Sequence, residues 1–367
     1  MKNPLFDLLI DKINTKGPIS IEEYMEVALT HPEFGYYRSQ EPIGKGGDFI
    51  TAPEISQMFG ELCGLWGLDQ IINQNIIHQA EWVEFGPGRG TFMSDIIRAC
   101  SGAMPTKEDL WIVNLFEVHE GLIKQQQEKL SKVVNLKHFD DFNDLPQKPL
   151  LFIANEFFDA LPIRQYISKG PHWYERCVTL KNDSLSLMEC DSPTENINFP
   201  KPRNDNEVLE YSPKLSDFVD KISKHINEFG GAALIIDYGK ENATGDTLQA
   251  VKDHKPADIL ENPGECDLSA WVDFSAIKHA ANAAGATAFG PKPQGEFLKQ
   301  LGLFQRAEQL GTGATSEERR KIVAAVDRLT SSAQMGNVFK VVAILPSSFS
   351  EISPQNIPGF ANTGDRT

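Results

Sequence analysis

Short apolar segments alternate with segments of helical periodicity between residues 81 and 154. The apolar segments are Glu81–Phe85, Trp111–Val118, Asn135–Phe139 and Leu150–Ala154. Apolar residues recur at helical spacing between them, at Phe92–Ile97 and Leu122–Leu130. Strands that are apolar on both faces must be covered by helices, and strands joined through helices run parallel. The alternation therefore predicts an α/β fold with a doubly wound, Rossmann-like parallel sheet.

The pattern changes after residue 164. Short strand-like segments joined by Gly, Pro and Asn turns predict an inserted antiparallel subregion, and the parallel pattern returns with a helix at 214–229 and a strand at 232–237. Further elements are expected as helices at 19–29, 55–66, 274–284, 296–301 and 317–330 and as a last strand at 339–345. The predicted domains are a helical and lid segment at 1–75, a core at 76–164 and 231–345, an inserted substrate or partner subregion at 165–230, and a flexible tail at 346–367.

The first strand runs into a glycine-rich turn, E-F-G-P-G-R-G-T at 84–91. Gly86, Gly88 and Gly90 allow a tight turn and close approach of the backbone to a ligand, and the following helix offers unpaired N–H groups. The third glycine comes one residue earlier than in the dinucleotide pattern G-x-G-x-x-G. The turn therefore favours S-adenosylmethionine as ligand and includes Glu84 in the predicted site. A dinucleotide and a packing turn without ligand are the alternatives.

Acidic residues follow the next two strands. Glu117 stands at the carboxyl end of the second strand, where a carboxylate of an α/β nucleotide site accepts the two ribose hydroxyls. Asp140 follows the third strand and is a candidate to bind the adenine amino group. Solvated acids at strand ends are the alternative for both.

The Gly/Pro-rich segment 31–54 shows neither helical nor strand periodicity, and loops of this length usually bind a ligand or cover a site. We expect its second half to form a lid over the cofactor, with Gly47 supplying backbone freedom and Thr51 a polar contact. The alternative is a plain capping loop, in which Thr51 precedes a helix that begins near Pro53.

A series of motifs spans most of the chain. They are G-Y-Y at 35–37, G-D-F-I-T-A-P-E-I-S at 47–56, E-F-G-P-G-R-G-T at 84–91, N-E-F-F-D-A-L-P at 155–162, I-D-Y-G at 236–239, D-T-L-Q-A-V at 246–251 and V-D-F at 272–274. In this order they resemble the MidA-like family of S-adenosylmethionine-dependent methyltransferases.

The resemblance implies a class I methyltransferase core with S-adenosylmethionine as cofactor. The mitochondrial members of this family are assembly factors of respiratory complex I, and for them it implies arginine methylation of a complex I subunit. For this chain we expect a protein substrate, with a respiratory complex I subunit as the candidate partner, and a homodimer. The rival functions are a small-molecule methyltransferase, a noncatalytic assembly scaffold and an NAD-dependent dehydrogenase.

The motif at 155–162 follows the fourth apolar strand, at the edge where such sheets bind ligands. Methyl transfer from a sulfonium needs mainly alignment of the nucleophile and exclusion of water. If the nucleophile is a guanidinium nitrogen, carboxylates bind the cation and orient it. Glu156 and Asp159 are therefore predicted to handle the substrate, and Asn155 to hold the substrate or the methionine moiety. The alternative is that the acids cap the following turn or helix.

Two further residues are candidates for the functional site, on weaker sequence patterns. Asp237 ends the fifth strand and is a candidate to border the target pocket, and His254 is a candidate proton acceptor, although a lone histidine is more often a satisfied polar group. The sequence contains no H-E-x-x-H, cysteine cluster or EF-hand pattern, so no metal site is expected.

The charge balance is acidic, with 35 Lys and Arg residues against 51 Asp and Glu residues and a formal net charge of −16. Nucleic acids and anionic membranes attract clustered cations, so neither is expected as the main partner. A basic segment of a protein partner suits this charge better.

The cysteines and the N-terminus indicate a compartment. The five cysteines are an odd number without a C-x-x-C pair, which predicts buried reduced thiols. No apolar run is long enough to span a membrane, and the N-terminus has neither a signal-peptide core nor the character of a transit peptide. We expect a cytoplasmic bacterial protein with mitochondrial eukaryotic relatives.

Overall fold

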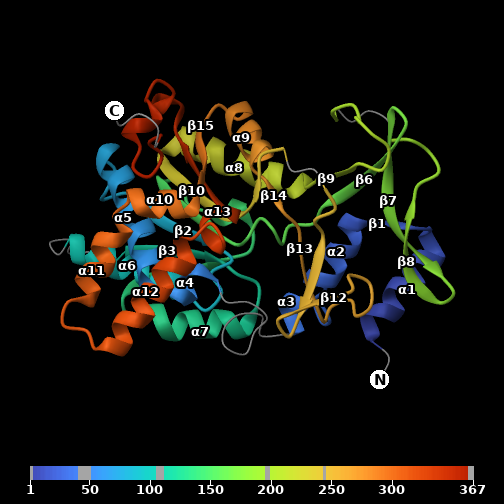
Figure 1. The fold of residues 1–367 in the computed structure, drawn as a ribbon, viewed down its shortest axis with the longest axis horizontal. Coiled ribbons are helices and arrows are strands. Elements are labelled where there is room, and N and C mark those ends of the chain that lie inside the picture. Colours follow the sequence, from blue (N-terminus) through green and yellow to red (C-terminus); the bar gives the residue numbers. More distant parts are fainter. Residues whose placement is uncertain (1–2, 40–50, 105–110, 195–198, 243–244, 363–367) are drawn as a thin grey trace. The chain divides into compact units, whose positions relative to one another are not determined.

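The computed structural model of the chain describes residues 3–39, 51–104, 111–194, 199–242 and 245–362. The chain divides into two compact units, whose elements are labelled in Figure 1. Unit 1 comprises residues 1–49, 159–216 and 242–273, and unit 2 comprises residues 50–158, 217–241 and 274–367. Each unit is therefore assembled from three separate stretches of the sequence.

The central sheet of unit 2 has the strand order β15-β16-β10-β5-β2-β3-β4. These strands are β2 (Glu81–Phe85), β3 (Trp111–Phe116), β4 (Val134–Phe139), β5 (Leu150–Asn155), β10 (Gly231–Lys240), β15 (Thr287–Pro293) and β16 (Phe339–Leu345). Strands β4, β3, β2, β5 and β10 pair in parallel, whereas β16 is antiparallel to both β10 and β15. The strand order reverses between β2 and β5, and open α/β sheets bind ligands at the carboxyl ends of strands at such a switch point.

Both faces of the sheet are covered, as the apolar strands predicted. On one face, Trp82 of β2 and Leu151 of β5 belong to the same core as α5 (Gln57–Asn73) and α6 (Thr91–Ala103). Residues of the other face point into a cluster of stacked and edge-on rings, Phe85, Phe116, Phe139, Phe152, Phe157 and Phe218. The period-2 alternation of side chains along each strand produces these two different cores.

Helix α5 approaches its neighbours closely because glycines occupy one of its faces. A Cβ atom added at Gly64 would lie 2.9 Å from the Cα of Ile96 in α6, and one added at Gly67 would lie 2.5 Å from the indole of Trp82. Neither distance is sterically acceptable. The glycines therefore allow α5 to pack directly on α6 and on the central strand β2.

The remaining helices of this part of the chain are α4 (Ala52–Ile55), α7 (Glu120–Leu130), α8 (Pro213–Phe229), α9 (Phe274–Ala283), α10 (Gln294–Gln300), α11 (Leu303–Gly311), α12 (Ser316–Thr330) and α13 (Met335–Val338). Among them, α8, α9, α10 and α12 agree with the expected helices. A capping box between Thr315 and Glu318 fixes the start of α12. Among the described residues, no helix is long and apolar enough to cross a lipid bilayer.

The described C-terminal residues, 346–362, differ from the flexible tail that we expected. Ile357 and Phe360 are buried in the core of unit 2, and Lys292 Nζ and Gln300 Nε2 both donate to the carbonyl of Ala361, at 2.6 and 2.9 Å. The segment is polar in composition, so the sequence did not indicate that Ile357 and Phe360 are buried.

Unit 1 combines helices with two antiparallel sheets. One sheet has the order β1-β7-β6-β9, with β8 paired to β7, and the other has the order β12-β11-β13. The strands of these sheets are β1 (Ile19–Ser20), β6 (Arg164–Lys169), β7 (His172–Lys181), β8 (Ser184–Glu189), β9 (Val208–Tyr211), β11 (Gln249–Lys252), β12 (Lys255–Ala257) and β13 (Asp267–Ser269), and β14 (Val272–Asp273) belongs to neither sheet. The helices are α1 (Pro4–Lys16), α2 (Ile21–Thr30) and α3 (Tyr36–Ser39).

The N-terminal helices and the inserted strands share one core. Leu9 of α1, Met25 of α2, Val178 of β7 and Leu268 of β13 are all fully buried in it. Unit 1 therefore joins the N-terminal segment to the inserted antiparallel region, which the sequence pattern presented as separate segments.

The sequence patterns missed several elements. Strand β15 contains Gly290 and Pro291 and has a register shift between Phe289 and Lys292, so its strand signal is broken; an edge strand tolerates this. Strands β11, β12 and β13 were not predicted. Helices α1 and α11 were also not predicted.

Candidate functional site

The glycine turn lies at the switch point of the sheet, between β2 and α6. Gly86, Gly88 and Gly90 all have left-handed backbone conformations, with φ of 63°, 51° and 70°. Gly90 occupies the N-cap position of α6, so no side chain caps the first turn of that helix. The turn therefore presents backbone N–H groups at a helix N-terminus, an arrangement suited to binding a polar ligand.

Neighbouring elements hold this turn in place. The Nε2 of Gln126, a buried residue of α7, donates to the carbonyl of Gly88 at 2.6 Å. A Cβ atom at Gly86 would stand 3.2 Å from the ring of Phe157, and one at Gly90 would stand 3.2 Å from Leu130. The turn is therefore packed from two sides. No local pattern in the sequence indicated that Gln126 supports it.

Glu84 is a buried acid of β2, two residues before Gly86. Its exposed fraction is 3%, and its Oε2 has no hydrogen-bond partner among the described residues. Burial, with the charge of Glu117 as a smaller cause, raises the pKa of Glu84 to about 8. A ligand that brings a positive charge, as the ammonium and sulfonium of S-adenosylmethionine do, would restore the ionised carboxylate. The orphaned carboxylate oxygen therefore fits the expected cofactor.

The raised pKa predicts that cofactor binding depends on pH. Below about pH 8 the free protein carries a proton on Glu84, and a cationic ligand favours its release. We expect the affinity for S-adenosylmethionine to rise with pH up to about 8, and about one proton to be released per ligand at pH 7. Calorimetry in two buffers of different ionisation enthalpy counts these protons. Glu84→Gln is the control, because it should abolish the proton release beyond that of the ligand itself; equal release by both proteins would contradict the assignment.

Glu117 lies where the sequence placed it, after the end of β3, and its carboxylate is largely engaged. Its Oε1 accepts from the backbone N–H groups of Val118 and His119, both at 2.9 Å, and its Oε2 accepts from Gln126 at 3.1 Å. A carboxylate oxygen can accept two hydrogen bonds. Oε2 therefore has room for one further donor, so direct bonds to both ribose hydroxyls would require Gln126 to move.

The other predicted cofactor residues have less specific surroundings. Asp140 is exposed in the bend after β4, and its neighbour Asp141 caps the turn by accepting from the N–H of Asn143 at 2.9 Å. Gly47 lies outside the described residues. Thr51 occupies the N-cap position of α4 but makes no side-chain capping bond there.

The start of the α4 segment is linked to the glycine turn by a polar chain. Glu54 of α4 accepts from the hydroxyl of Thr91 at 2.7 Å, and that hydroxyl accepts from Lys129 Nζ at 2.9 Å. Thr91 is the first residue of α6. The end of the predicted lid is therefore tied to the helix N-terminus that faces the candidate ligand site.

Asn155 is the last residue of β5 and Glu156 follows it, and β5 pairs with β2, the strand that precedes the glycine turn. Glu156 has a left-handed backbone with φ of 53°, which is unfavourable for a residue other than glycine. Its Oε1 accepts from Asn155 Nδ2 at 3.1 Å and from the N–H of Ala52 at 3.4 Å. The Oδ1 of Asn155 is buried without a hydrogen-bond partner among the described residues. Strained backbone of this kind concentrates at functional sites, so it singles out Glu156 independently of sequence motifs.

Asp237, which lies in the second half of β10, supports this turn. Its fully buried side chain accepts from the N–H of Phe158 at 3.0 Å and from the N–H of Tyr238 at 2.9 Å. The N–H of Glu156 donates to the carbonyl of Ile236 at 3.0 Å. The hydrogen bonds of Phe158 and Glu156 join the segment after β5 to β10. Asp237 therefore supports the turn that carries Glu156.

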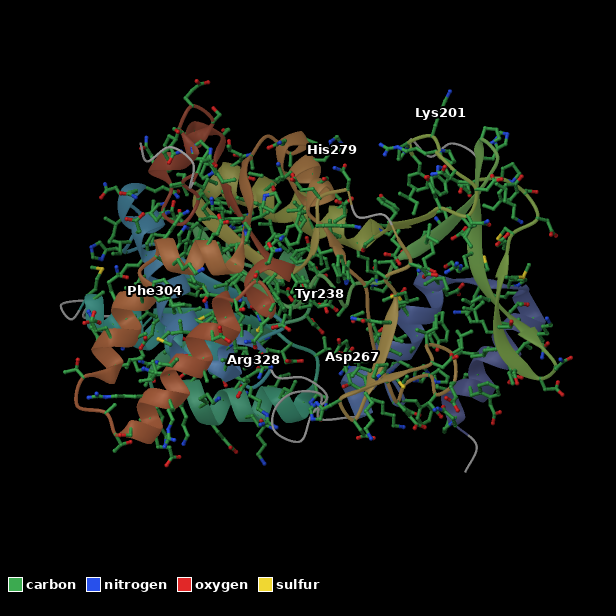
Figure 2. The ribbon with its side chains drawn as sticks, in the orientation of Figure 1. Lys201, Tyr238, Asp267, His279, Phe304 and Arg328 are labelled. Carbon is green, nitrogen blue, oxygen red and sulfur yellow. The ribbon has the colours of Figure 1, made fainter. Side chains whose placement is uncertain are left out.

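Asp159 belongs to unit 1 and lies in a turn that leads to β6 rather than to a helix. Its carbonyl accepts from the N–H of Ala270 at 2.9 Å. In the same unit, the hydroxyl of Tyr37 donates to Asp267 Oδ1 at 2.9 Å, and burial followed by the charges of Asp267 and Asp159 raises the pKa of Tyr37 well above its usual value. Asp267 is labelled in Figure 2. The sequence had not indicated that Tyr37 and Asp267 belong near Asp159.

His254 occupies a tight hairpin turn in unit 1. Asp253 and His254 join β11 to β12 with left-handed φ values of 51° and 60°, as two-residue hairpin loops require. Both residues are exposed. The position of His254 is explained by the turn, and nothing in its geometry adds to its candidacy as a proton acceptor.

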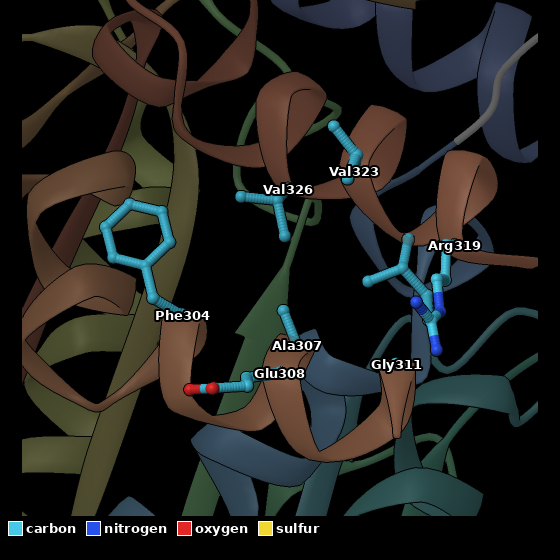
Figure 3. A pocket seen from close by; sticks show the side chains of 8 residues that line it. Phe304, Ala307, Glu308, Gly311, Arg319, Val323 and Val326 are labelled. Atoms are coloured by element: carbon cyan, nitrogen blue, oxygen red, sulfur yellow. The ribbon is translucent and has the colours of Figure 1, made fainter. Parts of the chain in front are cut away.

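An open apolar pocket of about 310 Å³ lies elsewhere in unit 2, between α11 and α12 (Figure 3). Its lining includes Phe304, Ala307, Val323 and Val326. None of its lining residues comes from the strand ends that carry the glycine turn and Glu156. The pocket is therefore separate from the candidate site.

Known proteins resemble the chain over nearly its whole length. Residues 62–292 match the family model "Putative S-adenosyl-L-methionine-dependent methyltransferase". Protein arginine methyltransferase NDUFAF7, mitochondrial, is 32% identical in Xenopus tropicalis, over 98% of this chain and 90% of that protein, and 32% identical in Homo sapiens, over 94% and 83%.

Solved structures agree with the fold. A COG1565 superfamily member from Burkholderia thailandensis, bound to S-adenosyl-homocysteine, has a TM-score of 0.80 and 24% identity over 95% of this chain and 94% of that one. A native structure of a COG1565 superfamily protein from the same organism has a TM-score of 0.78 and 25% identity, over 94% and 91%. These similarities confirm the predicted fold and the predicted cofactor, S-adenosylmethionine. The chain belongs to the family of S-adenosyl-L-methionine-dependent methyltransferases.

Proposed function

We propose that the chain transfers the methyl group of S-adenosylmethionine to a guanidinium nitrogen of an arginine in a protein partner. The observation that carries the proposal is the strained backbone of Glu156. This residue follows β5, which pairs with the strand before the glycine turn. Support for arginine comes from the relatives, which are named protein arginine methyltransferases. A respiratory complex I subunit is the narrower candidate substrate, and it rests on the family resemblance of the motifs alone.

In this reaction the bound cofactor supplies an activated methyl group, so the chain must bind, orient and desolvate the acceptor. The carboxylate of Glu156 would bind the guanidinium through charge-assisted hydrogen bonds and hold one nitrogen in line with the methyl group. Its negative charge would also stabilise the positive charge that develops on the acceptor, and a carboxylate oxygen would then accept the proton that the methylated nitrogen releases. Asn155 would supply the buried amide oxygen as a further acceptor.

Asp159, which belongs to unit 1, is proposed by itself as a substrate-binding acid. Its neighbourhood in unit 1 also contains Asp267, whose carboxylate is held by the hydroxyl of Tyr37. Two carboxylates and a phenol that stays protonated form an environment that favours a cation over a neutral group. This composition supports a guanidinium rather than a carboxylate or phosphate substrate.

The test is a methylation assay with S-adenosylmethionine and a panel of arginine-containing peptides from respiratory complex I subunits, read by mass spectrometry. We expect mass gains of whole methyl groups on arginine. The matched control replaces each arginine by lysine and should reduce methylation at least about tenfold, because an ammonium lacks the planar fork that two carboxylate oxygens recognise. Methylation of lysine peptides at the same rate, or of small molecules only, would contradict the proposal.

A further inference from the structure

A pair of cysteines lies outside the methyl-transfer site, in the β7–β8 hairpin of unit 1. Cys177 belongs to β7, and Cys190 directly follows β8. The N–H of Cys190 donates to the carbonyl of Glu175 at 2.8 Å, which extends the antiparallel pairing by one residue pair. Residues opposite each other, and residues two apart on a strand, share a face. Both sulfur atoms therefore lie on one face of the hairpin.

The sulfur atoms are close enough to react with each other. Cys177 Sγ and Cys190 Sγ are 3.1 Å apart, and neither is in a disulfide. A disulfide bond is about 2.05 Å long, so its formation needs an approach of only about 1 Å. Cys177 is buried, whereas Cys190 is partly exposed. A dissolved oxidant therefore meets Cys190 first.

The same atoms also form a group that could hold a metal ion, together with Glu175; all three ligand atoms lie within 4.8 Å of one another. Two observations disfavour this use. Arg164 occupies both oxygens of Glu175, with hydrogen bonds of 2.7 and 2.6 Å, and would place its charge beside a cation. Two thiolates at a tetrahedral zinc lie about 3.8 Å apart, given Zn–S bonds of about 2.3 Å, which is longer than the observed separation.

We propose that Cys177 and Cys190 form a site of reversible oxidative modification, at which a peroxide converts the two thiols to a disulfide across the β7–β8 hairpin. The thiolate of Cys190 attacks a peroxide oxygen, the O–O bond breaks, and Cys190 becomes a sulfenic acid. With hydrogen peroxide the leaving hydroxide takes up the proton lost by Cys190 and becomes water.

The second step closes the bond. Cys177 Sγ attacks Cys190 Sγ, the S–O bond breaks, and the hydroxide leaves as water with the proton of Cys177. In sum, two thiols and hydrogen peroxide give one disulfide and two waters. Burial, with Cys190 as a further cause, raises the pKa of Cys177, which assigns the first attack to Cys190 and the resolving step to Cys177.

The test treats the full-length reduced protein with a single equivalent of hydrogen peroxide. We expect a mass loss of two hydrogen atoms, a cross-linked peptide that contains Cys177 and Cys190, and recovery of both thiols with dithiothreitol. The oxidised protein should also melt at a higher temperature, because the bond closes a loop of 13 residues.

Three variants make the result specific. Cys266→Ala removes another buried thiol of unit 1 and should leave the cross-link unchanged. Cys177→Ser should leave Cys190 as a sulfenic acid that a dimedone probe traps, and Cys190→Ser should give neither product; circular dichroism checks that each variant folds. A cross-link through any other cysteine, or direct overoxidation of Cys190 in the unmodified protein, would overturn the proposal. Tight stoichiometric binding of Zn²⁺ that blocks the oxidation would replace it with a metal site.

Discussion

Replacement of Gly88 by valine is expected to abolish the binding of S-adenosylmethionine, with a loss of at least about 100-fold in affinity. Gly88 has φ of 51°, a conformation that costs an L-residue about 1–2 kcal/mol and a β-branched residue more. The turn cannot easily relax, because the carbonyl of Gly88 accepts a hydrogen bond of 2.6 Å from Gln126. The strain therefore falls on the backbone that approaches the ligand. Titration calorimetry with S-adenosylmethionine measures the effect.

Gly170→Val is the matched control for this experiment. Gly170 also has a left-handed backbone, with φ of 55°, and a Cβ atom there would meet no other atom within 4 Å. The substitution carries the same kind of local strain in an exposed turn of unit 1, so it should cost stability but leave cofactor affinity unchanged. Undiminished binding by the Gly88→Val protein would show that the glycine turn does not contact the cofactor.

The second large effect is expected at Glu156. Glu156→Gln keeps the shape of the side chain and the oxygen that accepts from Asn155 and from the N–H of Ala52, but it removes the charge. We expect the rate of methyl transfer to fall by about 100-fold or more, because a positioned carboxylate is lost at the reacting centre. The melting temperature and the affinity for S-adenosylmethionine should change little. Single-turnover assays with an arginine peptide measure the rate.

An acid outside the site provides the comparison. Glu241→Gln removes a surface carboxylate just after β10, whose ion pair with Lys278 at 2.9 Å is exposed and worth little. Its methyl-transfer rate should equal that of the unmodified protein. If Glu156→Gln methylates at the unmodified rate, Glu156 is a structural residue of the turn. If it loses activity together with its fold, the thermal melt reveals this directly.

Local patterns were sufficient to predict the parallel strands of the unit 2 sheet. A run such as Leu150–Ala154 is apolar at every position, and only a strand covered on both faces buries all of its side chains. The turn at 84–91 was also predictable, because alternating glycines after a buried strand permit the left-handed backbone conformations that a tight turn uses. The residue types that carry the cofactor site are therefore encoded over short distances.

Long-range packing decided the remainder of the fold. Unit 1 combines three stretches of chain, and the burial of Met25 beside Val178 and Leu268 depends on contacts across large sequence separations. No periodicity within one segment reports such a contact. Strand β15 was hidden for a related reason, since only its edge position in the sheet makes its Gly-Pro step acceptable.

Short segments of the sequence identify the candidate residues for the chemistry, because the glycines of the turn and the acids after β5 are recognisable from their neighbours. The way in which these residues are held depends on long-range contacts. The left-handed backbone of Glu156 persists because its N–H donates to the carbonyl of Ile236 in β10. The buried Glu84 keeps its proton because the folded core excludes water. Strain and desolvation are properties of the assembled environment, and no short segment contains that environment.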